Sequence, residues 1–580
     1  MFKKSLISTQ ADLFSGISQR VGDKKSSYLD NPRGWHNIFF SEITSRIDES
    51  PYSALYPGLT GRSNSPIRQL VAMMILKEGE SWTDNQLFES SRYNLLVMRA
   101  IGLQNLTDEP PVASTYYEFK KKLRLHYDQT GEDLLEQTFS SLTQDQVIRY
   151  EVSGKRVRMD SKLIASNIAK CTRLQLVISV LQQFYKAISK DTEWVSSSDL
   201  ESLQDLCSKT ADAHTYPLTN AEKQGFLERL GLLIHRLVQE CPDKTLKSYQ
   251  TLNRLFSQHY ELVEQKNQEE SKEEDSSSNE PPVGLRDKKT LAGNTLQSPH
   301  DTDATFRRKE SGEKEQLIKG YSSNITENCT PGELHLILAA QIENAGFSDE
   351  QYFQEAITKS EQVLQDLPDE VATDGAYNSK SNLDFIELKE KLIQWYLTAI
   401  QGKPGNFDFQ WDDQGQLLVT DRRTGQPQVA IKAKTRASTK NKAPRYRIKE
   451  PNGTYRYIEQ KAIGTYFRRQ DILKLPKEIR NIRPNVEATI HQVFYHLNGQ
   501  QSKYRGLIAH RHMVFARCFW VNYRRIADKI TKKGRWKAVF YFFKHLCIHQ
   551  VSYPLNQFRI NQRNISFANP NFIRLFQGTF

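Results

Sequence analysis

The chain has 580 residues, and its 80 lysines and arginines outnumber its 68 aspartates and glutamates, which gives a formal net charge of +12. It contains no run of about 18 or more apolar residues, so we expect no membrane span. The N-terminus lacks the apolar segment of a secretory signal. The six cysteines are scattered without a CxxC pair, which argues against a zinc or disulfide framework and fits a reducing cytoplasm.

The positive charge is concentrated in the C-terminal part of the chain. From Asp421 to Phe580 there are 33 lysines and arginines against 7 aspartates and glutamates, whereas the first 420 residues hold 47 against 61. Aromatic residues are interleaved with this charge, as in VNYRRIADKITKKGRWKAVFYFFKH. Base stacking and phosphate contacts use this mixture, so the pattern favours a nucleic acid over a membrane surface as the partner. The alternative is a solvated basic face without a ligand.

The first region of the chain, residues 1–150, is expected to be a helical domain. Residues 65–103 predict two or three helices, with Thr83 as an N-cap and Gln86 at the third helical position. A further helix is expected from Thr115 to Leu123. Such a domain can bind DNA in a helix-turn-helix manner or serve only as a packing module, and the sequence leaves both open. The apolar residues that recur at helical spacing are Ile67, Leu70, Val71, Met74 and Ile75.

The sequence changes its period after this region. Residues 151–168 predict a strand with two different faces, one of them half-exposed, because apolar and polar residues alternate. The alternating residues are Arg156, Val157, Arg158, Met159 and Asp160.

The next part of the chain mixes helical, acidic and strand-like stretches. Residues 170–265 return to a helical pattern and predict a helical insertion. Residues 266–290 are acidic and serine-rich, which predicts a mobile linker. After Leu296, the stretches SPHDTDATFRRK and KGYSSNITENC predict two strands joined by a charged hairpin.

The remaining elements lead to two further carboxylates. A short apolar run predicts a strand that ends at Asp374, and residues 406–465 are rich in strand signals. Pro484 suits the first position of a helix, which would place Glu487 in its first turn, where the helix dipole favours an ionised carboxylate. A longer amphipathic helix is expected from Leu507 to Ile530.

Asp160, Asp374 and Glu487 are the candidate catalytic residues. Two aspartates on neighbouring strand ends and a glutamate from a packed helix would form a cage of oxygen ligands, which Mg²⁺ and Mn²⁺ prefer. Two such ions about 4 Å apart are suited to breaking and rejoining phosphodiester bonds. Each residue alone also has an ordinary interpretation, as a turn former, a helix cap or a residue that complements the helix dipole.

Several motifs together resemble one family. DSKLIASNI, TDGAYNS and RPNVEATIHQVF, with KYRG downstream, resemble the three catalytic motifs of bacterial insertion-sequence DDE transposases. SPHDTDATFRRK and KGYSSNI resemble the second and third core strands of that family, and residues 65–103 resemble its helical N-terminal domain. One departure concerns the family's lysine seven positions after the glutamate: Phe494 stands there, and the nearest lysine is Lys503.

The resemblance implies an α/β fold with a ribonuclease H-like core, whose mixed five-stranded sheet is flanked by helices. Asp160 is expected on the first core strand, Asp374 after the fourth and Glu487 on a following helix, where they would hold two Mg²⁺ or Mn²⁺ ions. The core would comprise residues 151–169, 291–405 and 466–580, interrupted by the helical insertion, the linker and a strand-rich insertion over 406–465. The residues expected to contact DNA phosphates are Arg483, Lys503, Arg505, Arg511, Arg524 and Arg525.

The function that the resemblance implies is DNA transposition. We expect the protein to bind the terminal inverted repeats of its element as double-stranded DNA, to cleave the strand ends and to join them to target DNA. It would act as a homodimer in a synaptic complex, in the bacterial cytoplasm at the nucleoid. Two alternatives are a ribonuclease H-like nuclease or resolvase without strand transfer, and a non-catalytic DNA-binding repressor derived from a transposase.

Overall fold

In the computed structural model, nearly all described residues belong to one unit, Met1–Ala527, and only the last described residues, 528–531, fall outside it. In the described stretches no helix combines the length and the apolar character needed to cross a bilayer, and the five cysteines there are free thiols. The described stretches are residues 1–5, 15–58, 60–262, 283–287, 290–311, 314–398, 400, 404–433, 445–450, 453–480, 482–497 and 501–531.

The N-terminal region is helical, as the sequence predicts. The N-cap predicted at Thr83 is confirmed: its Oγ1 accepts a hydrogen bond from Gln86 N at 3.3 Å, and Gln86 Oε1 accepts one from Thr83 N at 2.9 Å. The elements are α1 (Ile17–Arg20), α2 (Asp23–Leu29), α3 (Trp35–Glu42), η1 (Thr44–Arg46), η2 (Ser50–Leu55), α4 (Ile67–Gly79), α5 (Asp84–Tyr93), α6 (Leu95–Ala100), α7 (Ala113–Thr130) and α8 (Leu134–Arg149).

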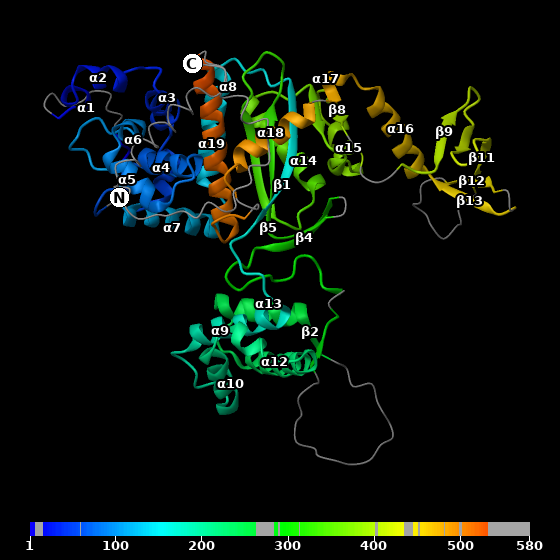
Figure 1. The fold of residues 1–580 in the computed structure, drawn as a ribbon, viewed down its shortest axis with the longest axis horizontal. Coiled ribbons are helices and arrows are strands. Elements are labelled where there is room, and N and C mark those ends of the chain that lie inside the picture. The colour runs from blue at the N-terminus through cyan, green and yellow to red at the C-terminus, as the bar shows by residue number, and fades with distance from the viewer. Residues whose placement is uncertain are drawn as a thin grey trace, which may run out of the picture. The chain divides into compact units, whose positions relative to one another are not determined.

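A mixed sheet of six strands forms the centre of the first unit. β1 lies between β5, to which it is antiparallel, and β7, to which it is parallel; β8 is parallel to β7 (Figure 1). The long β5 pairs with β4 along its first half and with β6 along its second half, antiparallel in both cases. The strands are β1 (Arg156–Ala165), β4 (Thr305–Ser311), β5 (Lys314–Asn328), β6 (Ile337–Asn344), β7 (Glu370–Thr373) and β8 (Gln394–Leu397).

Helices pack on both faces of this sheet. On one face, Ser161 Oγ donates a hydrogen bond to Asp349, the first residue of α14 (Asp349–Leu364). On the other face, α18 (Ile482–Phe494) packs against β1 and β7. Arg158, three residues before Ser161 and therefore on the opposite face, reaches the carbonyl oxygen of Ile482 at 3.2 Å. Because α18 covers it, Arg158 is only 4% exposed. Arg156, Asp160 and Lys162 on the same face are half-buried, so the expected half-exposed face is confirmed except at Arg158.

A long helix, α19 (Leu507–Thr531), connects the sheet with the N-terminal region. The Asn522 side chain bonds to both backbone groups of Ile337 in β6, at 2.7 and 2.9 Å. At the other end, Arg511 Nε donates to Asp133 Oδ2 at 3.0 Å, and its Nη2 donates to Glu136 of α8. The DNA contact expected of Arg511 is therefore corrected, because this guanidinium is buried between two carboxylates.

Two further parts of the chain interrupt the core. The helical insertion predicted over 170–265 has its own apolar core and consists of α9 (Arg173–Ile188), α10 (Ser197–Ser208), α11 (Ala211–Thr215), α12 (Asn220–Glu240) and α13 (Lys247–His259). It ends in β2 (Tyr260–Leu262), which pairs with β3 (Val283–Leu285). Of the predicted acidic linker, residues 266–282 and 288–289 lie outside the described residues.

The strand signals over 406–465 are confirmed as an antiparallel sheet whose strands follow chain order. Its strands are β9 (Phe407–Trp411), β10 (Leu417–Asp421), β11 (Pro427–Ala433), β12 (Arg445–Lys449) and β13 (Tyr455–Glu459), and α16 (Gln460–Lys474) follows directly. The sheet and α16 share a small apolar core. The remaining short elements are η4 (Gly375–Tyr377), α15 (Lys380–Glu387) and α17 (Lys477–Arg480).

The contact between Asp133 and α19 predicts a dependence on acid. Burial would raise the pKa of Asp133, but contacts with His512 and Arg511 lower it well below its ordinary value. The contribution of Asp133 to the free energy of unfolding is therefore complete above about pH 4, the pKa of this carboxyl in the unfolded chain. It is lost as the pH falls through the lower pKa of the folded state. Asp133→Asn should lower the denaturant midpoint at pH 7 and flatten its acid dependence. The same acid dependence in wild type and variant would contradict this assignment.

Candidate functional site

The structure brings two of the three predicted carboxylates to neighbouring strands. Arg158 of β1 lies opposite Ala372 of β7 in a parallel register. The pairing ends there; continued by two residues, the same register would set Asp160 opposite Asp374, which directly follows Thr373 at the end of β7. Neighbouring strands lie about 4.8 Å apart, and residues in register point to the same face. The two half-buried aspartates are therefore expected to lie near each other.

Local backbone bonds orient both carboxylates. Asp374 Oδ1 accepts a hydrogen bond from Ala376 N at 2.8 Å and so caps the turn η4. Asp160 Oδ1 accepts one from Ser161 N at 2.8 Å. Asp374, which ends the apolar run of β7, is thus a turn former, as its ordinary interpretation predicts. It is also the expected neighbour of a second carboxylate, that of Asp160.

The buried phenol of Tyr377 reports the negative charge at this place. Its hydroxyl donates to Asn324 Oδ1 at 2.7 Å. Burial, followed by the charges of Asp160, Asp349 and Asp374, raises the pKa of Tyr377 well above its ordinary value. Tyr377 therefore stays neutral and is buried near these acidic side chains.

Glu487 lies on the helix that packs over these strands. Val486 and Ile490 are buried against the sheet, whereas the side chain of Glu487 is exposed. The helix begins at Ile482 and not at Pro484. The expected place of Glu487 in the first turn is therefore wrong; it lies in the second turn, where the helix dipole favours a carboxylate less.

A buried ionic network fixes this helix on the sheet. Glu327 of β5 is 0% exposed, and its Oε1 accepts from Arg158 Nε at 2.7 Å. Its Oε2 accepts from Arg525 Nη1 at 2.7 Å, and both of its oxygens lie 2.8 Å from Thr489 Oγ1 of α18. Arg158 also reaches the Ile482 carbonyl oxygen, so β1, β5, α18 and α19 meet at one carboxylate.

The charge of Glu327 is stabilised by its partners. Burial would raise the pKa of this carboxyl, but the charges of Arg525 and Arg158 and the hydrogen bond from Thr489 lower it below its ordinary value. Glu327 is therefore ionised while fully buried, which requires all of these partners.

The donor set at the strand ends suits a hard cation. Asp160 and Asp374 supply carboxylate oxygens only, which is the chemistry that Mg²⁺ and Mn²⁺ prefer. Within the described residues, however, no three His, Cys, Asp or Glu side chains are close enough to hold a metal ion. In this structure Glu487 thus does not join the two aspartates as a third ligand, although its helix packs on both of their strands.

The KYRG motif lies along the far end of β1. Ser502 N donates to Ala165 O at 2.8 Å, and Arg505 Nε donates to Asn167 O at 2.6 Å. Lys503 and Arg505 are exposed there. Two of the predicted phosphate contacts therefore stand on a backbone segment that is hydrogen-bonded to the strand carrying Asp160.

The same motif joins the N-terminal region. The Tyr504 hydroxyl donates to Glu78 of α4, and the other carboxylate oxygen of Glu78 accepts from Arg517 Nε at 3.2 Å. The ammonium groups of Lys77 and Lys120 lie 5.7 and 5.4 Å from the Tyr504 ring centre. Tyr504 thus couples the core to the helical region.

The remaining predicted DNA contacts have mixed positions. The side chain of Arg483 lies outside the described residues. Arg525 is half-buried and bound to Glu327, which assigns it a packing role. Arg524 is half-buried and faces Glu80; burial raises the pKa of Glu80 to about 7, against the opposing charge of Arg524.

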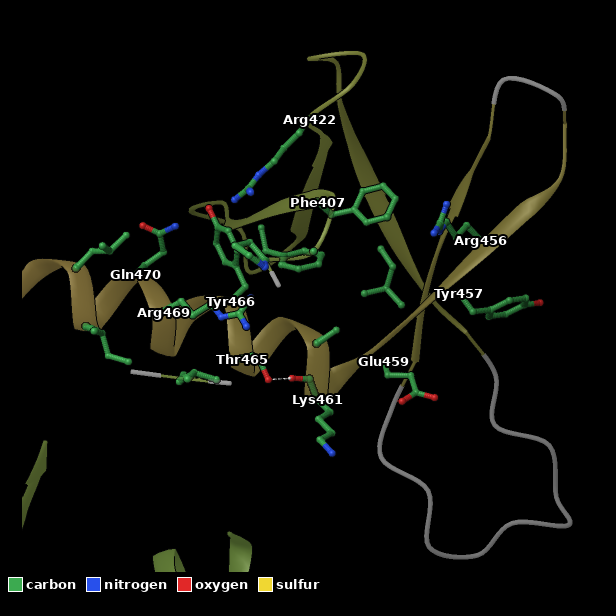
Figure 2. A pocket seen from close by; sticks show the side chains of 18 residues that line it. Phe407, Arg422, Arg456, Tyr457, Glu459, Lys461, Thr465, Tyr466, Arg469 and Gln470 are labelled. Atoms are coloured by element: carbon green, nitrogen blue, oxygen red, sulfur yellow. Dashed lines mark hydrogen bonds between the residues drawn. The ribbon is translucent and has the colours of Figure 1, made fainter. Parts of the chain in front are cut away.

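A hollow of about 850 Å³ lies between the strand-rich sheet and α16 (Figure 2). Two of its cations are paired, since Arg422 Nη2 lies 2.7 Å from Asp408 and Arg456 Nη1 lies 3.2 Å from Glu450. Neither aspartate of the pair lines this hollow. Its lining includes Phe407, Phe409, Arg422, Arg456, Lys461, Thr465, Tyr466, Arg469 and Gln470.

Helix α16 also reaches the turn that carries Asp374. Arg468 Nη1 donates to Asn378 Oδ1 at 2.9 Å, four residues after Asp374. The strand-rich sheet is therefore linked through α16 to the edge where the aspartates lie.

Sequence reasoning missed Glu327 and Arg158 as functional supports. In an alternating strand Arg158 is indistinguishable from a solvated residue. Its partner lies 169 residues away in the chain, so no local pattern could have identified the pair.

Removing the central carboxylate should destabilise the core. Glu327→Ala leaves the buried Arg158 without its partner, which should cost about 3–5 kcal/mol, measured as hydrogen-exchange protection of β5 and α18. Asp48→Ala breaks the exposed Lys4–Asp48 contact and should cost less than about 1 kcal/mol. Because the pKa of Glu327 is depressed in the folded state, the difference in free energy of unfolding between wild type and Glu327→Ala should shrink below about pH 4. Equal protection in both variants would contradict the network.

One comparison with known proteins gives a match. Residues 29–122 match a family model described as a transposase domain (DUF772). No curated protein and no solved structure matches the chain significantly. The matched stretch runs from the end of α2 into α7 and includes Glu78, the partner of Tyr504. Residues 29–122, within the helical N-terminal region, therefore form a transposase domain.

Proposed function

We propose that the chain is the transposase of an insertion sequence and acts by the DDE mechanism. It binds the terminal inverted repeats of its element, cleaves the strand ends and transfers them to target DNA. Asp160, Asp374 and Glu487 hold the divalent metal ions in this proposal. The observation that carries it is the parallel register of β1 and β7, which, continued beyond Arg158 and Ala372, would set Asp160 opposite Asp374.

The order of the central strands supports a ribonuclease H-like core. In the spatial order β6-β5-β1-β7-β8, neighbouring strands are antiparallel on one side of β1 and parallel on the other. This is the arrangement expected for such a core, with Asp160 on its central strand and Asp374 after the next strand. The connection from β6 to β7, which run parallel within the sheet without pairing, passes through α14.

Glu487 completes the site in this proposal when DNA and metal are bound. Its helix is fixed on both strands, and its side chain is exposed. Divalent ions, when bound, would activate a water or a 3′-hydroxyl and stabilise the departing oxygen. The chain's own contribution is to orient Asp160 and Asp374 through backbone N–H groups.

Replacing either aspartate should abolish chemistry and spare binding. Asp160→Asn and Asp374→Asn should each lower Mg²⁺-dependent nicking, and joining of precut ends, by at least about 100-fold. Affinity for inverted-repeat DNA should be retained. The assay is cleavage and strand transfer on labelled end DNA, and cleavage without joining by the wild type would favour the nuclease alternative.

A nearby aspartate is the matched control. Asp349 carries the same group but is held by Ser161 Oγ at 2.8 Å and lies 3.5 Å from Arg307 Nη1, on the other face of the sheet. Asp349→Asn should therefore keep most of the activity. A loss as large as that of Asp374→Asn would show that the ligands are assigned wrongly.

The exposed cations of the KYRG motif should contribute to DNA affinity through phosphates. A Lys503→Ala/Arg505→Ala double variant should weaken binding to all sequences and reduce the slope of log K against log salt by about 2. The exposed lysines of the helical insertion serve as control, so Lys209→Ala/Lys244→Ala should leave the slope unchanged. Equal slopes in wild type and the first variant would remove these residues from the interface.

A further inference from the structure

One face of the strand-rich sheet is open among the described elements. The opposite face packs on α16 through Phe409, Leu417, Val419 and Ile463. On the open face, large apolar side chains are unusually exposed: Val429 by 50%, Ile431 by 56%, Tyr455 by 47% and Tyr457 by 57%. Exposed apolar residues that gather on one face mark a binding surface more often than chance.

The strand register places these residues together. Ile431 pairs with Arg447, which pairs with Tyr457, and Lys449 pairs with Tyr455. Paired residues point to the same face, whereas their chain neighbours point to the other. Figure 2 shows the side chain of Tyr457 extending away from α16. We call this surface, made of Val429, Ile431, Arg445, Arg447, Lys449, Tyr455 and Tyr457, the outer face.

The outer face combines rings with cations. Arg445, Arg447 and Lys449 alternate along β12, next to the two tyrosines of β13. The Arg447 guanidinium lies 4.6 Å from the Tyr455 ring centre, so this cation is held over an aromatic surface. Only Arg445 has an acidic neighbour on this face, Glu459 at 3.9 Å, among the described ion pairs.

We propose that the outer face binds single-stranded DNA, with Tyr455 and Tyr457 stacking on two successive bases and the β12 cations holding the phosphates. This inference rests on the proposed function, because the bound single strand would be an unpaired part of the DNA that the protein cleaves and joins. Residues two apart on a strand are separated by about 7 Å, which leaves room for two splayed bases. Stacking on side chains needs base faces that a duplex keeps covered, so an unpaired strand fits better than a duplex.

Two observations favour DNA over a protein partner. Charged residues are depleted in the core of protein interfaces, whereas here three cations run through the middle of the patch. The sheet is also linked to the aspartate edge, because Arg468 of α16 bonds to Asn378 after Asp374. Arg468 lies eight residues after the start of α16, roughly 12 Å along the helix, so a strand leaving the aspartates would meet this sheet.

The test measures binding of a short fluorescent single-stranded oligonucleotide to the full chain by anisotropy, in EDTA. Tyr455→Ala/Tyr457→Ala should weaken this binding by about tenfold or more, and binding of the matching duplex by no more than about twofold. Tyr455→Phe/Tyr457→Phe keeps both rings and should bind like wild type. Tyr216→Ala removes a tyrosine that is 92% exposed on the helical insertion and should change nothing.

The outcomes separate the alternatives. Equal losses on single strand and duplex, a loss in the phenylalanine variant as large as in the alanine variant, or no loss at all would each overturn the proposal. Unchanged DNA affinity with an altered oligomeric state in light scattering would assign the face to a second copy of the chain, which also overturns it. Because no metal is present, the result is readable even if the chain proves unable to cleave DNA.

Discussion

The placement of α18 depends on one buried carboxylate. Glu327 is surrounded by Arg158, Thr489 and Arg525, which come from β1, α18 and α19. An isolated ionised group at this depth would be strongly unfavourable, so the network forms only when all four segments are in place. A single interaction therefore ties together parts of the chain that are far apart in sequence and sets how the helix lies on the sheet.

This constraint also defines the geometry of the candidate site. Arg158 and Asp160 are two residues apart on β1 and face the same side, so the network and the aspartate pair share one face of the sheet. Glu487 lies between Ile482 and Thr489, the two points at which α18 is anchored. Its backbone is fixed while its side chain is exposed, which suits a ligand that joins a site only when metal and DNA arrive.

The sequence was sufficient where the pattern is local. The strand around Asp160, the turn at Asp374 and the capping box at Thr83 follow from alternation, turn chemistry and cap residues. It failed where a distant partner decides. The sequence predicts a DNA contact for Arg511 and assigns no partner to Arg158, because nothing within one element reveals that each one meets a carboxylate from another part of the chain.

In our proposal, the segments fixed by Glu327 bring Asp160, Asp374 and Glu487 to one metal site when DNA and metal are bound. The most direct measurement is anomalous diffraction from crystals of the full chain with end DNA and Mn²⁺. The account predicts manganese bound by Asp160 and Asp374, with the Glu487 carboxylate turned in to join them. Manganese bound elsewhere, or bound at the aspartates while Glu487 stays turned to solvent, would contradict it.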